Sequence, residues 1–202
     1  MNIGRLISVN WLKTLTLSLK NGCKNVIYNR VAIHIDDSTS IKSTGIFEMG
    51  RRYYKEDNRT SGLCMSKNAQ IIVKGDEQIY SGAYITVGEN AVLQFGGGYC
   101  NHNLIVDCFE NISIGKDVII SKNVIIRDSD NHSIESPGFK KTKPVVIKDH
   151  VWIGMNVTIL KGVTIGEGAV IAAGSVVTQD IPPCCLGAGV PCRVKKRNVV
   201  WK

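Results

Sequence analysis

The stretch VVIKDHVWIGMNVTILKGVTIGEGAVIAAGSVVT, residues 145–178, decides the fold. Aliphatic residues recur in it every six positions, and a second small or aliphatic residue stands two positions before each of them. The recurring residues are Ile147, Ile153, Ile159, Ile165, Ile171 and Val177, and the earlier partners are Val145, Val151, Val157, Val163, Ala169 and Ser175. A spacing of two puts both partners on one face of a strand. Each unit of six residues therefore predicts one short strand with an apolar inward face.

Turn-forming residues separate these strands. They stand at the third position after each recurring residue and are His150, Asn156, Gly162, Gly168, Gly174 and Asp180. Glycine and asparagine tolerate a positive φ, so they can turn the chain sharply. A helix needs apolar residues three and four positions apart, and this many glycines would weaken it severely. The segment is therefore predicted to be strand and turn.

The same repeat extends towards the N-terminus. It is clear at Ile114, Ile120 and Ile126, with Ile112, Val118 and Val124 two residues before them, and fainter at Val87, Leu93, Ile35, Ile41 and Phe47. An isolated unit could not bury its apolar face, so successive coils must stack on one another. The sequence thus predicts one all-β domain over residues 1–202, a prism with an apolar interior and an irregular or weakly repetitive part at residues 1–60.

Two N-terminal segments depart from the repeat. Residues 1–20 have Leu12, Leu15 and Leu19 at helical spacing, but the interleaved polar residues fit a strand equally well, so both readings stay open. Residues 48–68 are polar and basic. A solvated loop or a weakly repetitive coil is favoured there over a binding patch.

A third break carries the candidate catalytic residue. Periodicity stops at Asp128 and resumes at Pro144, so residues 128–144 form a loop that includes His132. Connections of this length are uncommon in compact domains and are usually functional when they are ordered. We therefore look for the active site in this loop.

Composition excludes several classes. Hydrophobic residues at 44% and charged residues at 21% are ordinary globular usage, and the net charge of +8 favours anionic partners. The basic residues are scattered and aromatics are only 6%, which argues against nucleic-acid binding. No apolar run is long enough to span a membrane, and Arg5, Asn10 and Lys13 interrupt the apolar start, so we expect no signal peptide and at most peripheral membrane association. Seven cysteines without a CxxC pair indicate reduced thiols in the cytoplasm and no metal site.

The repeat, the loop DSDNHSI and the ending VWIGMNVTILKGVTIGEGAVIAAGSVVTQDIPPCCLGAGVPCRVKK (residues 151–196) together resemble the hexapeptide-repeat acyltransferases. The similarity is to the branch with maltose, galactoside and Nod-factor acetyltransferases and polysaccharide O-acetyltransferases. It implies a left-handed parallel β-helix, a homotrimer with each active site between two subunits, and acetyl-CoA as co-substrate. The implied reaction is acetyl transfer to a hydroxyl of a sugar or surface-polysaccharide precursor.

The resemblance also suggests site residues. His132 is the candidate general base, since neutral imidazole accepts a proton near neutral pH. Asp128 and Asp130 could orient the imidazole, or they could be solvated loop acids. Asn101 in YCNHN resembles the family asparagine that contacts acceptor or intermediate, and an ordinary turn asparagine is the alternative.

The cofactor positions come from the same similarity. Met155 in WIGM stands where the family places a backbone N–H on the thioester oxygen, and a side-chain change from Ser to Met keeps that donor. Trp152 lines the cofactor or acceptor slot or packs between coils. Ala173 and Thr178 match residues along the CoA channel, and Arg193 and Lys196 match cations near the CoA phosphates. The flanking Lys195, Arg197 and Lys202 could be a solvated basic tail.

Other functions remain as alternatives. An amino-sugar N-acetyltransferase is the nearest, and a non-catalytic β-helix scaffold is the one from a different class. A covalent route through Cys100 or Cys108, activated by His102 or His132, is the chemical rival. A carbonic anhydrase of this fold needs a close histidine pair that is missing, and His34, His102 and His150 fit structural roles better. A nucleotidyltransferase needs a Gly-rich loop that is also missing.

Overall fold

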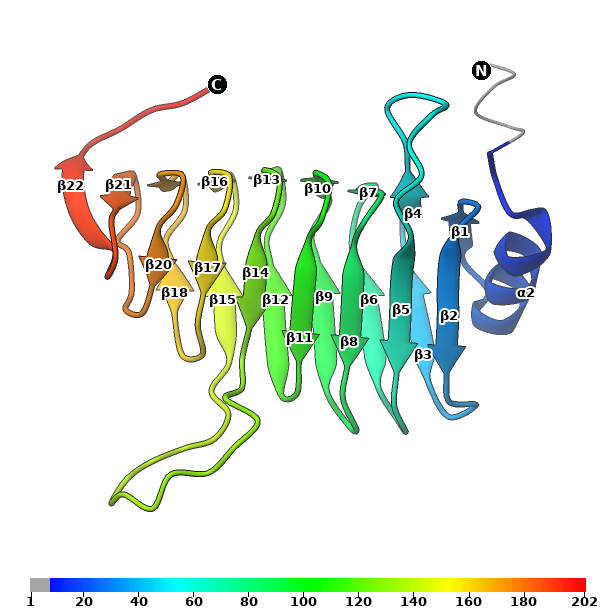
Figure 1. Cartoon of the computed structure of the whole chain (residues 1–202), viewed down its shortest axis with the longest axis horizontal. Helices are drawn as coiled ribbons and strands as arrows, with labels where there is room; N and C mark the ends of the chain where they lie inside the picture. Colours follow the sequence, from blue (N-terminus) through cyan, green and yellow to red (C-terminus); the bar gives the residue numbers. More distant parts are fainter. Residues whose placement is uncertain (1–7) are drawn as a thin grey trace.

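Three parallel β-sheets form the sides of a prism (Figure 1). The chain visits the sheets in turn and, as far as β20, adds every third strand to the same sheet. The computed structural model describes residues 8–202. Sheet 1 consists of β1 (Lys24–Ile27), β4 (Ile46–Arg51), β7 (Glu77–Tyr80), β10 (Gly98–Cys100), β13 (Val118–Ile120), β16 (Trp152–Ile153), β19 (Val170–Ile171), β21 (Cys185–Ala188) and β22 (Arg193–Arg197). Sheet 2 consists of β2 (Val31–Ile35), β5 (Ser61–Met65), β8 (Tyr84–Val87), β11 (Ile105–Cys108), β14 (Ile125–Arg127), β17 (Thr158–Ile159) and β20 (Val176–Val177). Sheet 3 consists of β3 (Ser40–Ser43), β6 (Gln70–Val73), β9 (Val92–Phe95), β12 (Asn111–Ile114), β15 (Val145–Ile147) and β18 (Thr164–Ile165).

The strands are connected at three edges of the prism. We name each edge by the sheets that it joins: corner 1–2 includes residues 121–124 and 154–157, corner 2–3 includes residues 128–144 and 160–163, and corner 3–1 includes residues 148–151. All strand pairs are parallel apart from β22, which runs antiparallel to β21 at the C-terminal end. A residue's corner therefore determines which other residues of the chain it can meet.

The apolar interior is the one that the six-residue repeat predicts. The recurring residues of the repeat stack in register, as where Ile120 pairs with Ile153 and Ile153 with Ile171. Each of these side chains is buried. Burying a large aliphatic side chain contributes roughly 1.5–3 kcal/mol, so the stacked rows dominate the stability of the fold.

Most of the predicted turns adopt the predicted backbone. φ is positive at His150 (53°), Asn156 (57°), Gly162 (77°), Gly168 (66°) and Gly174 (73°). The prediction is wrong for Asp180, whose carboxylate instead accepts a hydrogen bond from the Thr164 N–H at 2.7 Å. The regular repeat ends here because Pro182 and Pro183 follow, and the positive φ moves to Cys184 (52°).

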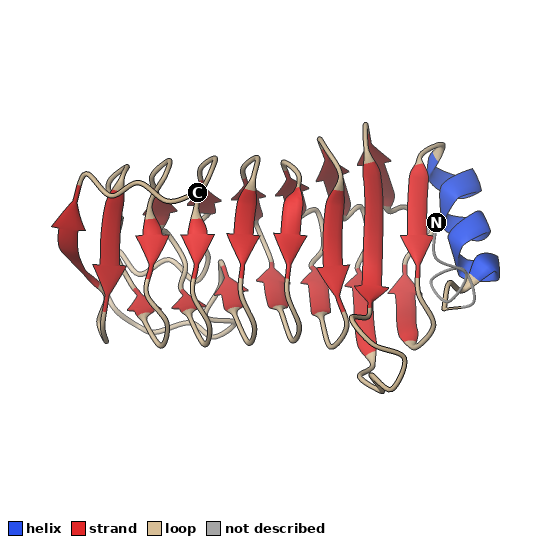
Figure 2. Cartoon of the chain, turned by 90° about the horizontal axis from the view of Figure 1, so that it is seen from above, coloured by secondary structure: helices blue, strands red, loops and turns tan. Residues whose placement is uncertain are grey.

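The open question over residues 1–20 is resolved as a helix where the structure describes them. α2 (Trp11–Asn21) begins after Asn10, whose side chain accepts a hydrogen bond from the Lys13 N–H at 3.1 Å, and it ends at Gly22 in the left-handed conformation. These two residues are typical caps of a helix. Figure 2 shows α2 across the N-terminal end of the prism, opposite β22. Within the described part of the chain, no helix is long and apolar enough to cross a membrane.

Residues 48–68 combine a coil with an excursion. β4 and β5 continue sheets 1 and 2, as a weakly repetitive coil would, and residues 52–60 leave the prism between them at corner 1–2 (Figure 1). The excursion is not simply solvated, because the side chain of Asp57 within it is buried.

Candidate active site

The loop that carries His132 is fixed to corner 2–3 by a buried carboxylate. Asp128 accepts hydrogen bonds from the backbone N–H groups of Phe109, Glu110 and Asn111 at 2.7–2.8 Å. These three groups form the same corner one coil earlier, so the carboxylate ties two coils together where the loop leaves the prism. Burial raises the pKa of Asp128, and the three donors oppose that rise without cancelling it.

The base of the loop is closed by a short antiparallel contact. Ser129 bridges Thr142, the Asp130 N–H donates to the Lys141 carbonyl at 3.0 Å, and the Lys143 N–H donates to the Asp128 carbonyl at 2.9 Å. The two arms of the loop are therefore held side by side before it opens at residues 131–140. This pairing gives a long excursion a defined direction.

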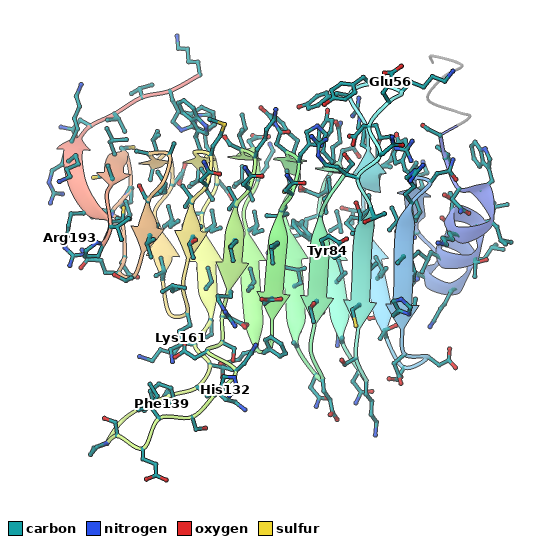
Figure 3. All side chains as sticks on the ribbon, in the orientation of Figure 1. Glu56, Tyr84, His132, Phe139, Lys161 and Arg193 are labelled. Atoms are coloured by element: carbon teal, nitrogen blue, oxygen red, sulfur yellow. The ribbon has the colours of Figure 1, made fainter. Side chains whose placement is uncertain are left out.

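Lys161, in the following coil, holds the loop from above. Its ammonium group pairs with the Asp130 carboxylate, donates to the Lys140 carbonyl, and lies 4.1 Å from the centre of the Phe139 ring. Figure 3 shows Lys161 at the edge of the prism with His132 and Phe139 on the loop below it. We did not single out Lys161 from the sequence, because in the repeat it occupies an ordinary turn position.

His132 is exposed on this anchored loop. Among residues 8–202 no group hydrogen-bonds to its imidazole, and no bond joins it to Asp128 or Asp130. The two acids instead fix the loop, one through backbone N–H groups and the other through Lys161. An orienting role for either of them stays a prediction. The arms of the loop are anchored, and the imidazole itself is exposed to solvent.

A second group of predicted residues gathers at corner 1–2. Met155 and Ala173 occupy equivalent turns of successive coils, where the Gly174 N–H donates to the Met155 carbonyl at 2.8 Å. In the described residues the Met155 N–H itself has no hydrogen-bond partner, so it can donate to a ligand. Asn101 lies at the same corner nearer the N-terminus, and its side chain accepts a hydrogen bond from the His102 N–H at 2.8 Å.

Trp152 lies on the outer face of sheet 1, next to corner 1–2. Its side chain is half-exposed, so part of the ring can contact a ligand, and the choice between a slot-lining role and packing between coils stays open. Its ring is 6.1 Å from Trp201 of the C-terminal segment, which in turn stacks on His150 at 4.1 Å. The rings of Trp152, Trp201 and Tyr99 border a shallow cavity of about 280 Å³.

The remaining predicted residues lie towards the C-terminal end. Thr178 follows β20 at corner 2–3, and Arg193 and Lys196 stand on β22. All three are exposed, and Figure 3 shows Arg193 at the end of the prism. In one chain, therefore, His132 and Thr178 belong to corner 2–3, whereas Asn101, Met155 and Ala173 belong to corner 1–2.

Comparison with known proteins agrees with this geometry. A family described as bacterial transferase hexapeptide (six repeats) matches residues 144–179. The galactoside O-acetyltransferase of Escherichia coli K12 is 38% identical over 138 residues, which are 60% of this chain and 68% of the relative. The chain belongs to the hexapeptide-repeat acetyltransferase family.

Two further relatives extend the match beyond the C-terminal coils. The polysialic acid O-acetyltransferase of Escherichia coli O1:K1 is 42% identical over 140 residues, but the aligned part is only 43% of that protein. The crystal structure of the polySia-specific acetyltransferase NeuO superposes with a TM-score of 0.56 and 26% identity over 88% of this chain and 84% of the other. The family fold is the left-handed parallel β-helix, which confirms what the resemblance implies.

The sequence reasoning missed a buried polar cluster beneath the 52–60 excursion of this family member. Ser81 Oγ hydrogen-bonds to the Asp57 carboxylate and lies 2.9 Å from His102 Nδ1, and Arg59 lies 3.0 Å from the same carboxylate. Burial acts to raise the pKa of Asp57, but hydrogen bonds from Ser81 and Arg59 hold it below its usual value. Burial lowers the pKa of His102, which favours the neutral ring. The serine bridges acid and imidazole and is itself buried, so the cluster is no nucleophilic triad and instead fastens the excursion.

The cysteines argue against a covalent route. Cys100 and Cys108 are buried, and burial raises the pKa of both thiols. A thiolate at either position is therefore disfavoured, and neither sulfur is open to a thioester. Within residues 8–202 no cluster of three or more His, Cys, Asp or Glu side chains could hold a metal ion.

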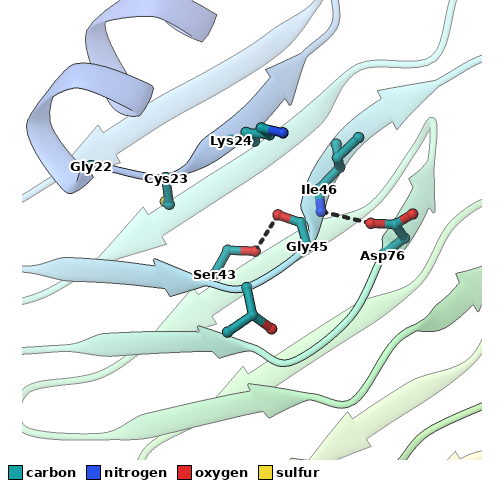
Figure 4. A pocket seen from close by; sticks show the side chains of 8 residues that line it. Gly22, Cys23, Lys24, Ser43, Gly45, Ile46 and Asp76 are labelled. Carbon is teal, nitrogen blue, oxygen red and sulfur yellow. Dashed lines mark hydrogen bonds between the residues drawn. The ribbon is translucent and has the colours of Figure 1, made fainter.

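A second cavity lies away from every predicted site residue. It has a volume of about 370 Å³ and sits between the end of α2 and corner 3–1 (Figure 4). Its wall is fixed by hydrogen bonds from the Ile46 N–H to Asp76 and from Ser43 Oγ to the Gly45 carbonyl. Among the described residues no histidine lines this cavity, so we do not assign the reaction there.

Proposed function

We propose that this protein transfers an acetyl group from acetyl-CoA to a hydroxyl of a sugar or surface-polysaccharide precursor, with His132 as general base. The observation that carries the proposal is an exposed imidazole on a loop that a buried carboxylate and Lys161 hold in one direction. A general base must be positioned as well as available, and this loop provides both. The names of the relatives, O-acetyltransferases of polysialic acid and of galactosides, support the reaction type.

The proposed reaction is a direct transfer. His132 accepts the proton of the acceptor hydroxyl while the hydroxyl oxygen attacks the thioester carbon. The tetrahedral intermediate carries a negative oxygen, to which the free Met155 N–H donates a hydrogen bond. The carbon–sulfur bond then breaks, and the leaving thiolate takes the proton from the imidazolium. No acyl-enzyme forms, in keeping with the burial of Cys100 and Cys108.

The corner residues suit the long arm of acetyl-CoA. The small side chain of Ala173, next to Met155, leaves room for the pantetheine along corner 1–2. Arg193 and Lys196 are exposed cations at the C-terminal end, where phosphates of the nucleotide would find charge complements. Thr178 lies at corner 2–3 and would reach the arm only from a neighbouring copy.

We further propose that the active site forms between two copies of the chain in a homotrimer. His132 and the Met155 N–H belong to different corners, so one prism presents them on different edges. Packing prisms side by side places corner 2–3 of one copy against corner 1–2 of the next. Each interface of a closed ring then contains one complete set of residues.

The acceptor is proposed to be a sugar hydroxyl on a precursor in the cytoplasm. The net charge of +8 favours acidic glycans or sugar nucleotides over neutral acceptors. Seven cysteines, all free thiols, fit a reducing compartment.

The test uses labelled acetyl-CoA with free sugars, sugar nucleotides and oligosaccharides as acceptors. His132→Ala is expected to lower turnover by a factor on the order of 10² to 10⁴, while acetyl-CoA affinity changes little. His34→Ala, at an exposed histidine on β2, is the matched control and should keep full turnover. Near-normal turnover of His132→Ala would remove the imidazole from the mechanism. Acetylation of amino sugars alone would make the reaction N-acetylation, and no acetyl-CoA binding by calorimetry would point to a scaffold.

A further inference from the structure

The inward face of α2 is unusually polar for a buried surface. Thr14 and Leu17 are its buried residues, and the Thr14 hydroxyl exchanges hydrogen bonds with the backbone of Ile27 in β1. Asn21 accepts a hydrogen bond from the Ile41 N–H at 2.8 Å. The helix is thus joined to the first coil of the prism by the buried side chain of Leu17 and by hydrogen bonds.

The outward face of the same helix is apolar. Trp11 is 52% exposed, Leu12 78%, Leu15 56% and Leu19 82%. At 100° per residue these four positions fall within one arc of about 100°, on the side away from Thr14 and Leu17. The usual arrangement of a surface helix is therefore inverted, since its large apolar side chains point to the outside. Contiguous exposed patches of this kind mark sites of association.

The position of the helix defines the shape of its partner. Figures 1 and 2 show α2 at the extreme N-terminal end of the prism, with no coil of the prism beyond it. A flat surface can approach this end without meeting the sides of the prism. The helix has 11 residues, too few to span a bilayer.

The charge of this end defines the chemistry of the partner. α2 itself carries the cations Lys13 and Lys20 and no acid, and Lys24 and Arg30 follow it before the first acidic residue of the sequence, Asp36. The ammonium group of Lys20 lies 3.8 Å from the exposed carboxylate of Asp37. A second copy would bring the same cations with it and repel this one. An anionic lipid surface attracts them, with each cation close to the surface contributing on the order of a fivefold increase in binding.

We propose that α2 is a membrane-surface anchor that inserts Trp11, Leu12, Leu15 and Leu19 among the headgroups of an anionic bilayer. An interfacial helix of this kind lies in the plane of the surface with its apolar face buried and its cations near the lipid phosphates. The prism then stands end-on to the bilayer. The anchor is independent of the acetyl-transfer proposal, because it uses none of the proposed active-site residues.

The experiment is flotation of the full chain with vesicles. Vesicles of phosphatidylcholine with about 30% phosphatidylglycerol, which gives them a negative surface potential, are compared with vesicles of pure phosphatidylcholine. Leu12→Asp and Leu19→Asp place a charge on the outward face. Val200→Asp is the matched control, because Val200 is 85% exposed at the opposite end of the chain. Circular dichroism checks that all three variants are folded.

We expect the unchanged chain and Val200→Asp to bind anionic vesicles equally. Both leucine variants should bind at least about tenfold more weakly, and pure phosphatidylcholine should capture little of any form. Equal binding of Leu19→Asp and Val200→Asp would overturn the anchor, as would failure of the unchanged chain to bind. Self-association in sedimentation that Leu19→Asp abolishes, without vesicle binding, would replace the bilayer by a second copy.

Discussion

Two variants that are each inactive should restore activity when they share one oligomer. The first is His132→Ala, which removes the base at corner 2–3. The second is Met155→Pro, which removes the backbone donor at corner 1–2. Proline fits there because Asn156, the next residue, has a φ of 57°, and turns with a left-handed third residue commonly have proline at the second. Each change should lower turnover by a factor on the order of 10² or more.

The expected recovery follows from the geometry of the corners. Each interface takes corner 2–3 from one chain and corner 1–2 from the next. In a trimer that contains both variants, the three interfaces therefore differ in which variant supplies each corner. Only one of these joins an intact His132 with an intact Met155 N–H. The doubly tagged trimer should therefore recover about one third of wild-type turnover, well above either parent.

The assay is co-expression with two different affinity tags, tandem purification and measurement of labelled acetyl transfer. Trimers of each single variant provide the background. The second control is a trimer that combines wild-type chains with chains that carry both substitutions. Recovery no greater than the background would show that base and donor come from the same copy. The assignment of the two corners to one intersubunit site would then be refuted.

Three further predictions concern buried or anchoring charges. Burial raises the pKa of Glu77, in the core beside Cys100, to about 7, so the folded state holds a proton that the unfolded chain loses near pH 4.5. The free energy of unfolding should therefore fall by about 3 kcal/mol between pH 4.5 and 7, and urea denaturation of Glu77→Gln should lack this slope. Asp128→Asn should lower stability by about 2 to 4 kcal/mol, measured by urea denaturation, because an amide cannot accept from all three N–H donors. Lys161→Met should lower kcat about tenfold without changing the affinity for acetyl-CoA, and it should speed proteolysis within residues 131–140. An unchanged rate of proteolysis in this loop would contradict the anchoring role of Lys161.

The repeat made the prism and its interior predictable. The spacing within each six-residue unit tells which side chains face inward. Ile153 and Ile171 could therefore be assigned to the core without knowledge of their neighbours. The turn at Asp180 was mispredicted because the prolines after it end the repeat. α2 could not be separated from a strand by periodicity alone, and its caps, Asn10 and Gly22, carried the information that decided it.

The contacts between side chains of different coils could not be predicted from the repeat. Asp57, Ser81 and His102 meet although 24 and 21 residues separate successive members. Ile153 and Ile171, further along, pair across 18 residues. Because the coils differ in length, the motif does not tell which residues of successive coils lie next to each other. The spacing therefore predicts neither the polar cluster nor the hydrogen bonds from residues 109–111 to Asp128. The position of His132 was predictable, but the groups that fix its loop were not.

The architecture explains why an enzyme of this kind needs a long anchored loop. A prism keeps its corners apart, and side chains at corner turns point outwards, so two corners of one copy cannot close on a substrate. An excursion at corner 2–3 can cross to a neighbouring copy: arms of about five residues beyond the Ser129–Thr142 bridge reach roughly 15 Å. In the proposed trimer, His132 would lie close to that bridge and therefore near the interface, and the far end of the loop would extend over the neighbouring copy. In the proposed site, anchoring by Asp128 and Lys161 would set the distance between His132 and the thioester, so changes to these two residues should affect turnover more than binding.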